Sequence, residues 1–279
     1  MALQPGFVVV DATVGLGGHA EAILQAVGPE GRLVGIDRDQ EALERAGKRL
    51  ENEGDRVKLV HGTFGELAQV LMEREVKGAD AVLFDLGVSS YQLDTPERGF
   101  SFLREGPLDM RMDQTQERTA AEIINGARVQ ELTDLLREFG QERWAGRIAK
   151  AIVRERPFTT TTALAQAIRR AVPSSARHQR IDPATRTFQA LRIAVNREME
   201  VLPHGLKQAI DCLKPGGRIA VLAYHSLEDR IAKVVLREQA REGRLKVLTP
   251  KPIRPSEKEV ARNSRSRSAH LRIAQRTAP

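Results

Sequence analysis

The sequence predicts an α/β fold: a largely parallel sheet covered by helices on both faces, with an all-helical domain inserted into it. Between residues 7 and 85, short and nearly all-apolar segments alternate with helical ones, which is typical of parallel strands buried on both faces. From about residue 113 this alternation stops, and apolar residues recur at helical spacing, as at Leu132, Leu136 and Phe139. We therefore expect a core formed by residues 1–112 and 184–279, and a helical insertion over 113–183.

The first part of the chain supplies four predicted strands. The strand over residues 7–11 ends at Asp11 and is followed by a glycine-rich loop, Gly15–Gly18. The helix after this loop stops before Pro29, because proline cannot continue a helix. Further strands are expected over 32–37, 57–60 and 81–85, and helices over 19–27, 40–50 and 64–74.

The later part of the chain completes the insertion and the sheet. Thr162 is expected to cap a helix over 163–171, and a helix over 195–212 returns the chain to the sheet. A fifth strand is expected over 218–224, followed by a helix capped by Ser226, whose first turn carries acids that complement the helix dipole. Strands over 245–248 and 270–274 are expected to close the sheet, with an extended surface loop, KPIRPSEKEVARNSRSRS, between them.

The net charge of +7 is distributed unevenly over the 279 residues. Residues 143–192 carry eleven Lys or Arg against two acids, residues 241–279 carry eleven against three, and the rest of the chain is acidic. Two basic segments on an acidic body predict that a polyanion such as a nucleic acid binds on one side. The alternative interpretation is a pair of ordinary solvated helix faces.

Composition disfavours several other classes of protein. No apolar run reaches the roughly 20 residues that a membrane helix needs, and the first residues lack the charged and apolar regions of a signal peptide. Cys212 is the single cysteine, so no internal disulfide forms, which fits a reducing, cytoplasmic setting. We expect Cys212 to pack in the core. Six scattered histidines and one cysteine show no metal-ligand spacing, so no metal site is expected.

A nucleotide site is predicted where the first strand meets the first helix. The loop GLGGHA, which begins at Gly15, fits the pattern G-x-G-x-x-G/A, and Asp37 ends the second strand 20 residues beyond Gly17. Glycines let backbone N–H groups approach a ligand, and an acid at the second strand binds ribose hydroxyls in dinucleotide-binding folds. The alternative is a plain turn and a surface aspartate.

The ligand of such a site is either NAD or S-adenosylmethionine (SAM), and three features favour SAM. Asp11 stands before the loop, where an acid would meet a cationic methionyl amine but gain nothing from a pyrophosphate. Asp85 is another acid at a strand end, so Asp11, Asp37 and Asp85 should converge on one crevice. The turn LKPGGR, residues 213–218, resembles the one in many SAM methyltransferases.

Longer motifs run along nearly the whole chain. They are DATVGLGGH (11–19), GIDRD (35–39), HGTF (61–64), DLGVSSYQLD (85–94), RGFSF (98–102), GPLDMRMD (106–113), TRTFQALRIAVN (185–196), KPGGR (214–218), HSLEDR (225–230) and the closing SRSRSAHLRIAQR. On these motifs the sequence resembles the RsmH (MraW) family, bacterial SAM-dependent methyltransferases of small-subunit ribosomal RNA.

The resemblance implies methyl transfer to the exocyclic N4 of a cytidine in the decoding region of 16S rRNA. It implies a Rossmann-like class I SAM methyltransferase core with an inserted all-helical domain. Asp85 is expected to bind SAM and, as the catalytic residue, to accept a hydrogen bond from the cytosine amine; the simpler alternative is a helix-capping aspartate. Phe64 would lie against the adenine. The expected cofactor contacts are Asp11, Gly15, Gly17, Gly18, His19, Asp37, Phe64, Asp85 and Gln92.

The expected macromolecular partner is 16S rRNA in the small ribosomal subunit. Phosphate contacts are expected at Arg143, Arg147, Lys150, Arg154, Arg169, Arg170, Arg177, Arg180 and Arg186, with Arg265 and Arg267 adding to them. Candidates for stacking on the target base are Tyr91, Phe100 and Phe102, and candidates for bordering its pocket are His225 and Ser226.

Two other functions stay open at this point. An NAD-dependent oxidoreductase would need no basic segments, and a non-catalytic rRNA-binding assembly factor would need none of the three acids. A homodimer is compatible with the sequence. The family usually has a His-x-Pro-Val-Leu-like string before the first strand, whereas six residues precede Phe7 here, so we expect a truncated chain or a misassigned start.

Overall fold

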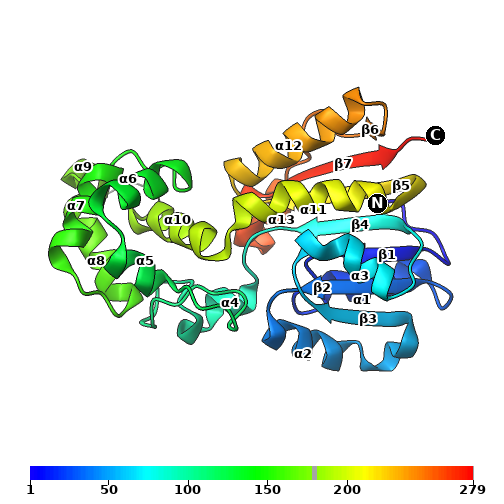
Figure 1. The fold of residues 1–279 in the computed structure, drawn as a ribbon, viewed down its shortest axis with the longest axis horizontal. Helices are drawn as coiled ribbons and strands as arrows, with labels where there is room; N and C mark the ends of the chain where they lie inside the picture. Colours follow the sequence, from blue (N-terminus) through cyan, green and yellow to red (C-terminus); the bar gives the residue numbers. More distant parts are fainter. Residues whose placement is uncertain (178–180, 279) are drawn as a thin grey trace. The chain divides into compact units, whose positions relative to one another are not determined.

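The computed structural model describes residues 1–177 and 181–278 and divides into two compact units. The first unit comprises Met1–Gly87 and Met199–Pro279, and the second comprises Val88–Glu198. The labelled elements of both units are shown in Figure 1. Among the residues described, no helix is both long and apolar enough to cross a membrane.

The first unit is built on a seven-stranded sheet of order β3-β2-β1-β4-β5-β7-β6. Strands β1 to β5 run parallel, whereas β7 runs antiparallel to β5 and β6. The predicted α/β fold is thus confirmed, and its strand order reverses beside β1, where open α/β sheets bind ligands. The strands are β1 (Val8–Asp11), β2 (Arg32–Asp37), β3 (Val57–His61), β4 (Ala79–Asp85), β5 (Leu213–Ala223), β6 (Leu245–Val247) and β7 (His270–Arg276).

Helices pack on both faces of this sheet, because successive strand residues point to opposite faces. Val9 and Leu83 join an apolar cluster with residues of α1 and α2. Val10 and Phe84 join another with residues of α3, α11 and α12, and Cys212 packs half-buried at its margin. The helices of this unit are α1 (Gly18–Val27), α2 (Gln40–Arg49), η1 (Glu51–Arg56), η2 (Phe64–Glu66), α3 (Leu67–Glu73), α11 (Glu198–Cys212), α12 (Ser226–Arg241), α13 (Glu257–Arg262) and η4 (Ser264–Ser268).

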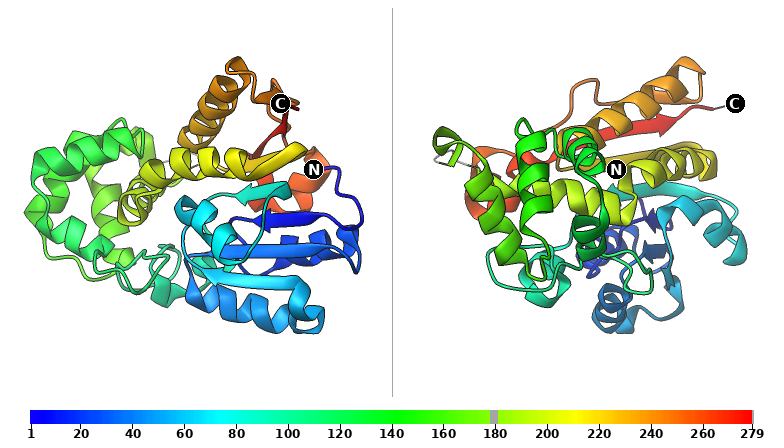
Figure 2. Two further views of the ribbon diagram at one scale, coloured as in Figure 1. Left: turned by 45° about the vertical axis from the view of Figure 1, so that its right-hand side comes forward. Right: turned by 60° about the vertical axis from the view of Figure 1, so that its left-hand side comes forward.

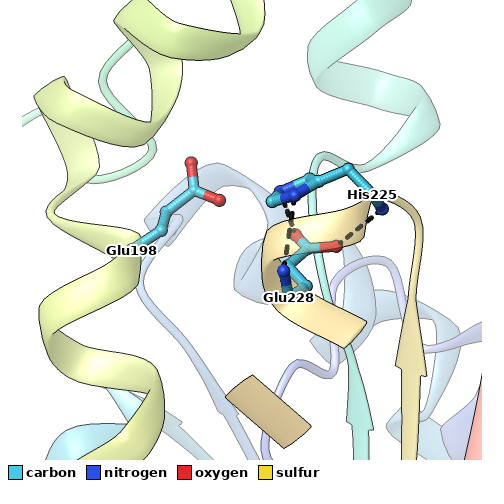
Figure 3. Close-up of side chains that lie close together, drawn as sticks. All are labelled: Glu198, His225 and Glu228. Carbon is cyan, nitrogen blue, oxygen red and sulfur yellow. Dashed lines mark hydrogen bonds and ion pairs between the residues drawn. The ribbon is translucent and has the colours of Figure 1, made fainter. Parts of the chain in front are cut away.

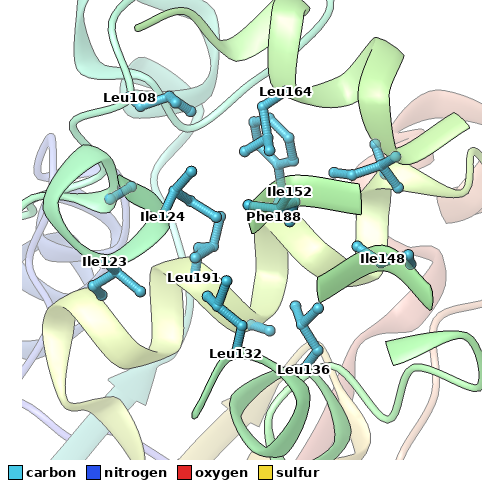
Figure 4. Close-up of a cluster of buried hydrophobic side chains, with 14 of the residues drawn as sticks. Leu108, Ile123, Ile124, Leu132, Leu136, Ile148, Ile152, Leu164, Phe188 and Leu191 are labelled. Carbon is cyan, nitrogen blue, oxygen red and sulfur yellow. The ribbon is translucent and has the colours of Figure 1, made fainter. Parts of the chain in front are cut away.

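The second unit contains helices and no strand among its described residues, as the green part of the ribbon in Figure 2 shows. Leu132, Ile148, Ile152 and Leu191 belong to the apolar cluster of this unit, to which α5, α6, α7, α8 and α10 all contribute (Figure 4). Its elements are α4 (Ser90–Asp94), η3 (Pro96–Arg98), α5 (Ala120–Gly126), α6 (Val129–Glu138), α7 (Ala145–Glu155), α8 (Thr161–Ala171), α9 (Ser174–Arg177) and α10 (Ala184–Asn196).

The helical unit extends beyond the range 113–183 expected from periodicity. Phe100, Leu108 and Met110 precede that range, and Phe188 follows it, yet all four are buried in the apolar cluster of the helical unit. The compact unit therefore spans Val88–Glu198. Residues 88–112 contain only short helical elements, so their apolar residues carry no helical period that would assign them to this core.

Two helix boundaries differ from the prediction. The single helix expected over 195–212 is wrong, because Arg197 has a left-handed φ of 51° and separates α10 from α11. Thr160, not Thr162, caps α8: its hydroxyl oxygen accepts a hydrogen bond from Ala163 N at 3.3 Å. The Thr162 hydroxyl donates instead to Glu105.

The tail expected to be an extended loop contains α13 and η4, so that prediction is wrong. Ser256 caps α13 by accepting a hydrogen bond from Glu259 N at 3.2 Å. Asn263 then caps η4 by accepting from Arg265 N at 3.1 Å. These short polar caps favour helical turns in a segment that has too few apolar residues to show a helical period.

Helix α11 packs so closely on the start of η2 that Gly205 has no room for a side chain. A Cβ atom at Gly205 would stand 2.6 Å from Phe64 Cδ2 and 2.9 Å from Phe64 O. The second contact is with backbone, so rotation of the Phe64 ring alone would not relieve it. The close approach of these two elements therefore requires glycine.

Replacing Gly205 with alanine should destabilise the protein by about 1–3 kcal/mol, because overpacking outweighs the better helix propensity of alanine. Gly47 in α2 is a matched control, since a Cβ there would meet only Leu59 Cδ1 at 3.8 Å. Gly47→Ala should stabilise the fold by roughly 0.5–1 kcal/mol. Urea unfolding measures both changes, and a Gly205→Ala variant as stable as the wild type would contradict the close contact.

Candidate active site

Three carboxylates end three neighbouring strands. Strand β1 ends at Asp11, β2 at Asp37 and β4 at Asp85. The order β2-β1-β4 and the parallel pairing place the three strand ends at one edge of the sheet. Asp85 and Asp37 act electrostatically on Asp11, where both raise the pKa of its carboxyl. The structure thus brings together the three acids that we predicted, from their places at strand ends, to lie close to one another.

The loop after β1 is held by the acid of β2. Gly15 N donates to Asp37 Oδ2 at 2.8 Å, and Asp39 N donates to Asp37 Oδ1 at 2.9 Å. Gly17 has a φ of 81°, a left-handed conformation that favours glycine, and it immediately precedes α1. No side chain caps the first turn of α1, which starts at Gly18. The backbone N–H groups of that turn are therefore suited to an electronegative ligand group.

Asp11 is fully buried. Its Oδ1 accepts a hydrogen bond from Thr13 N at 3.2 Å, whereas its Oδ2 has no hydrogen-bond partner in the described part of the chain. Burial, and to a smaller extent the charges of Asp85 and Asp37, raise the pKa of Asp11 to about 7 against the effect of the Thr13 bond. A buried carboxylate oxygen without a donor is suited to a cationic group.

Asp85 is held from three sides. Its backbone N donates to Thr13 Oγ1 at 2.7 Å, and its Oδ1 accepts from the Tyr224 hydroxyl at 2.8 Å. Its Oδ2 stands 3.4 Å from His19 Nδ1 in α1. Burial raises the pKa of Asp85, while the bond from Tyr224 and the charge of His19 lower it. Since Ser89 caps the next helix, α4, Asp85 is not a helix cap.

Sequence reasoning missed two residues at this carboxylate, Thr13 and Tyr224. Tyr224 directly follows β5, which pairs with β4 in parallel, so the strand-end argument that found Asp85 could also have found Tyr224. Thr13 carries no comparable signal, because a hydroxyl residue in a glycine-rich loop is an ordinary turn residue.

Phe64 and Gln92 are the predicted cofactor contacts outside the strand ends and the glycine loop. Phe64 begins η2 shortly after β3, is half-buried, and meets Phe84 edge to face at 5.5 Å between ring centroids. Gln92 lies in the helical unit, where Ser89 N donates to its Oε1 at 3.0 Å and its own N donates to Ser89 Oγ at 3.2 Å. Gln92 thus serves the capping box of α4.

The segment after β5 enters α12 through a histidine cap. His225 Nδ1 accepts from Glu228 N at 3.4 Å, and His225 N donates to the Glu228 carboxylate at 3.3 Å (Figure 3). His225 therefore caps α12, and the expected cap at Ser226 is wrong. The spacing explains the result, because a glutamate three residues after the cap position completes a capping box.

Four of the predicted RNA contacts lie along α7 and the turn that precedes it. Arg147, Lys150 and Arg154 are exposed on α7 at spacings of three and four residues, so they share one helix face, and Arg143 is exposed two residues before the helix begins. Trp144, which sequence reasoning missed, lies beside them, with the guanidinium carbons of Arg143 and Arg147 at 5.1 and 5.7 Å from its ring centroid. We call these four basic residues the α7 stripe.

The other predicted RNA contacts of the helical unit have more restricted side chains. Arg169 and Arg170 each form an ion pair of 2.7 Å with an acid of the same unit. Arg186 donates to a backbone carbonyl at 3.4 Å. Arg180 and the side chain of Arg177 lie outside the described residues.

The two arginines of the tail lie at the edge of the sheet that carries the strand-end acids. Arg265 and Arg267 are exposed in η4, shortly before β7. The first residue of β7, His270, pairs with Ala223 at the end of β5. Because β5 is parallel to β4, η4 lies at the same edge of the sheet as Asp85.

The strand order with an antiparallel β7, the glycine loop and the strand-end acids define the class of protein as an α/β methyltransferase. The chain belongs to the MraW methylase family, whose model matches residues 1–277. It is 48% identical to "Ribosomal RNA small subunit methyltransferase H" of Syntrophotalea carbinolica, over 98% of this chain and 93% of that protein. It is 50% identical to the protein of the same name from Thermobifida fusca, over 98% and 88%.

These comparisons confirm the family that the motifs predicted, and with it the class of enzyme. They give no support to the oxidoreductase alternative.

The pKa of Asp11 gives a prediction for the protein without ligand. Its carboxyl should titrate near pH 7, and Asp85→Asn should lower that pKa by removing a neighbouring negative charge. Because the folded-state pKa is raised, Asp11 costs stability as pH rises from about 4 to 7; Asp11→Asn should gain relative stability over this range, on the order of 4 kcal/mol at most.

Carbon-13 NMR of the aspartate carboxyls measures the titration, and urea unfolding at several pH values measures the stability. An Asp11 that titrates near pH 4 would contradict its buried environment.

Proposed function

We propose that this protein transfers the methyl group of SAM to the exocyclic N4 of a cytidine in the decoding region of 16S rRNA, on the small ribosomal subunit. The observation that carries the proposal is the buried Oδ2 of Asp11, which has no hydrogen-bond partner among the described residues and lies next to Asp85 and the glycine loop, in a chain of the MraW methylase family. The name of the relatives supports small-subunit rRNA as the substrate. A ribosomal substrate and a single cysteine favour the cytoplasm as its location.

The acids suit the groups of SAM. The ammonium of the methionyl part would supply the donor that Asp11 Oδ2 lacks. Asp37 keeps further lone pairs for the ribose hydroxyls, since each carboxylate oxygen accepts more than one hydrogen bond. Phe64 would offer its ring to the adenine. The remaining proposed contacts are Gly15, Gly17, Gly18, His19, Asp85 and Gln92.

The role of Asp85 follows from the chemistry of the cytosine amine. When bound, SAM supplies an electrophilic methyl group on a cationic sulfur. The N4 lone pair is delocalised into the ring, so Asp85 orients the amine by accepting one N4–H, which localises the lone pair and stabilises developing positive charge. The nitrogen–carbon bond forms as the carbon–sulfur bond breaks and leaves its electron pair on sulfur. The surplus proton on nitrogen passes to Asp85, whose raised pKa eases the transfer, or to water.

The target base must leave its stack to reach this carboxylate. Phe100 is buried in the apolar cluster of the helical unit. Phe102 packs edge to face on Phe188, with 4.8 Å between ring centroids. Tyr91 stays a candidate for stacking on the base.

The α7 stripe is the proposed contact for rRNA phosphates. In the part of the chain that the structure describes, no ion pair involves Arg143, Arg147 or Lys150, so their charge is available to a partner. Such contacts position RNA without reading its sequence. Arg265 and Arg267, at the sheet edge that carries Asp85, are proposed to hold the backbone beside the target cytidine.

Tritiated SAM and small ribosomal subunits that lack the modification test the reaction directly. Nucleoside analysis of the rRNA should find the label in N4-methylcytidine, and Asp85→Ala should abolish it. Label in another nucleoside would overturn the substrate, and absence of SAM binding would overturn the assignment of the strand-end acids. Full methyl transfer by Asp85→Ala would remove Asp85 from the mechanism.

Changing Arg143, Arg147 and Lys150 together to glutamine should weaken binding to the small subunit and reduce its salt dependence. Each lost phosphate contact should lower the slope of log affinity against log salt by about 1. Filter binding from low to moderate salt measures this slope.

A matched control removes three other exposed charges, Lys48, Arg74 and Lys77, of which the last two precede β4 at the opposite edge of the sheet. For this control variant, the slope of log affinity against log salt should equal that of the wild type. Equal slopes for both triple variants would place the RNA surface elsewhere.

A further inference from the structure

A tyrosine beside the proposed catalytic carboxylate has no role in the function described so far. In the register of β4 with β5, Asp85 pairs with Leu222, and Tyr224 follows two residues later. Residues two apart on an extended chain point to the same face, so the sheet brings the phenol to the side of Asp85. The Tyr224 hydroxyl donates to Asp85 Oδ1 at 2.8 Å.

The backbone of Tyr224 is fixed from both directions. Its N–H donates to Glu228 Oε2 at 2.8 Å, and Glu228 is only 2% exposed. On the other side, Ala223 is the last residue of β5 and pairs with His270 of β7. A side chain carried by such a constrained segment can hold its partner in one orientation, which a flexible loop could not do.

We propose that Tyr224 is a positioning residue for methyl transfer: it occupies Asp85 Oδ1 and so leaves Oδ2 to accept the N4–H of the target cytosine. This inference rests on the proposed function of Asp85. Oδ2 is the oxygen that faces His19 Nδ1, 3.4 Å away at the start of α1. The carboxylate oxygen left for the substrate therefore lies on the side of the glycine loop.

The phenol of Tyr224 acts as a donor and not as a base. Burial and the negative charges of Asp85 and Glu228 raise the pKa of Tyr224, so it keeps its proton at neutral pH. Its hydrogen bond lowers the pKa of Asp85, which burial raises. Tyr224 therefore favours the ionised form of Asp85, the form that accepts N4–H. The other titratable groups that act on this pair are Asp11 of β1, His19 of α1, Glu228 of α12 and Glu259 of α13.

Tyr224→Phe removes one hydroxyl and keeps the ring. With small subunits as substrate, kcat should fall by about 10- to 100-fold, while the Kd for SAM and the unfolding midpoint stay close to those of the wild type. Activity requires ionised Asp85 and is lost as pH falls through its pKa. Without the phenol this pKa is higher, so the acid limb of the kcat profile should move to higher pH.

Asp85→Asn provides a readout that needs no turnover. The chain has two tyrosines, so the difference between wild type and Tyr224→Phe in an ultraviolet pH titration isolates the signal of Tyr224. In Asp85→Asn, Tyr224 should ionise at lower pH, because the neighbouring negative charge is gone. The double variant should be no slower than Asp85→Asn alone, since Tyr224 acts through Asp85.

The outcomes separate this inference from the proposed function. If Asp85→Asn methylates at the wild-type rate, the proposed function of Asp85 fails. If Asp85→Asn is inactive while Tyr224→Phe keeps the wild-type kcat and acid limb, the positioning role of Tyr224 is overturned. A Tyr224→Phe defect confined to SAM affinity or to stability would overturn it as well.

Discussion

The gathering of three carboxylates, one buried and two half-buried, at one edge of a parallel sheet is the constraint on which the geometry of the site depends. Burial disfavours the charged form of each acid and raises its pKa, and neighbouring charges add to the effect at Asp11. The fold offsets part of this cost with donors from separate elements. Gly15 donates to Asp37, and Tyr224 donates to Asp85. These hydrogen bonds to the acids thus constrain the shape of the glycine loop and the path of the chain after β5.

Of the three acids, Asp11 has the fewest donors to offset the cost of its burial, because one of its carboxylate oxygens has no donor in the described part of the chain. A cation beside it would lower its pKa and favour its ionised form. Under the proposed function, SAM brings an ammonium and a sulfonium, whereas the product has a neutral sulfur. The three acids therefore attract SAM more strongly than the product with its neutral sulfur, and this difference assists release of the product.

The sequence predicted those parts of the site that depend on local pattern. Apolar strands that end in an acid, followed by glycine or helix, identify Asp11 and Asp85 as strand-end residues, and parallel topology then brings them together. The extent of the helical unit was not predictable, because Phe100 and Phe188 join its core only through tertiary packing. The place of Tyr224 directly after a strand could be predicted from the sequence, but its hydrogen bond to Asp85 depends on the register of β4 with β5, which no local pattern encodes.

The turn η4 places positive charges at the sheet edge that carries the strand-end acids. Asp11 is buried and Asp37 and Asp85 are half-buried at the strand ends, whereas Arg265 and Arg267 are exposed just before β7. An RNA phosphate that approached the acids through a medium of low dielectric would be repelled. Under the proposed function, the exposed arginines at this edge would reduce that repulsion and attract the phosphate at longer range. Under the proposed function, β7 therefore contributes to the site in two ways: it pairs with β5, the strand that leads to Tyr224, and the basic turn before it lies at the edge that carries Asp85.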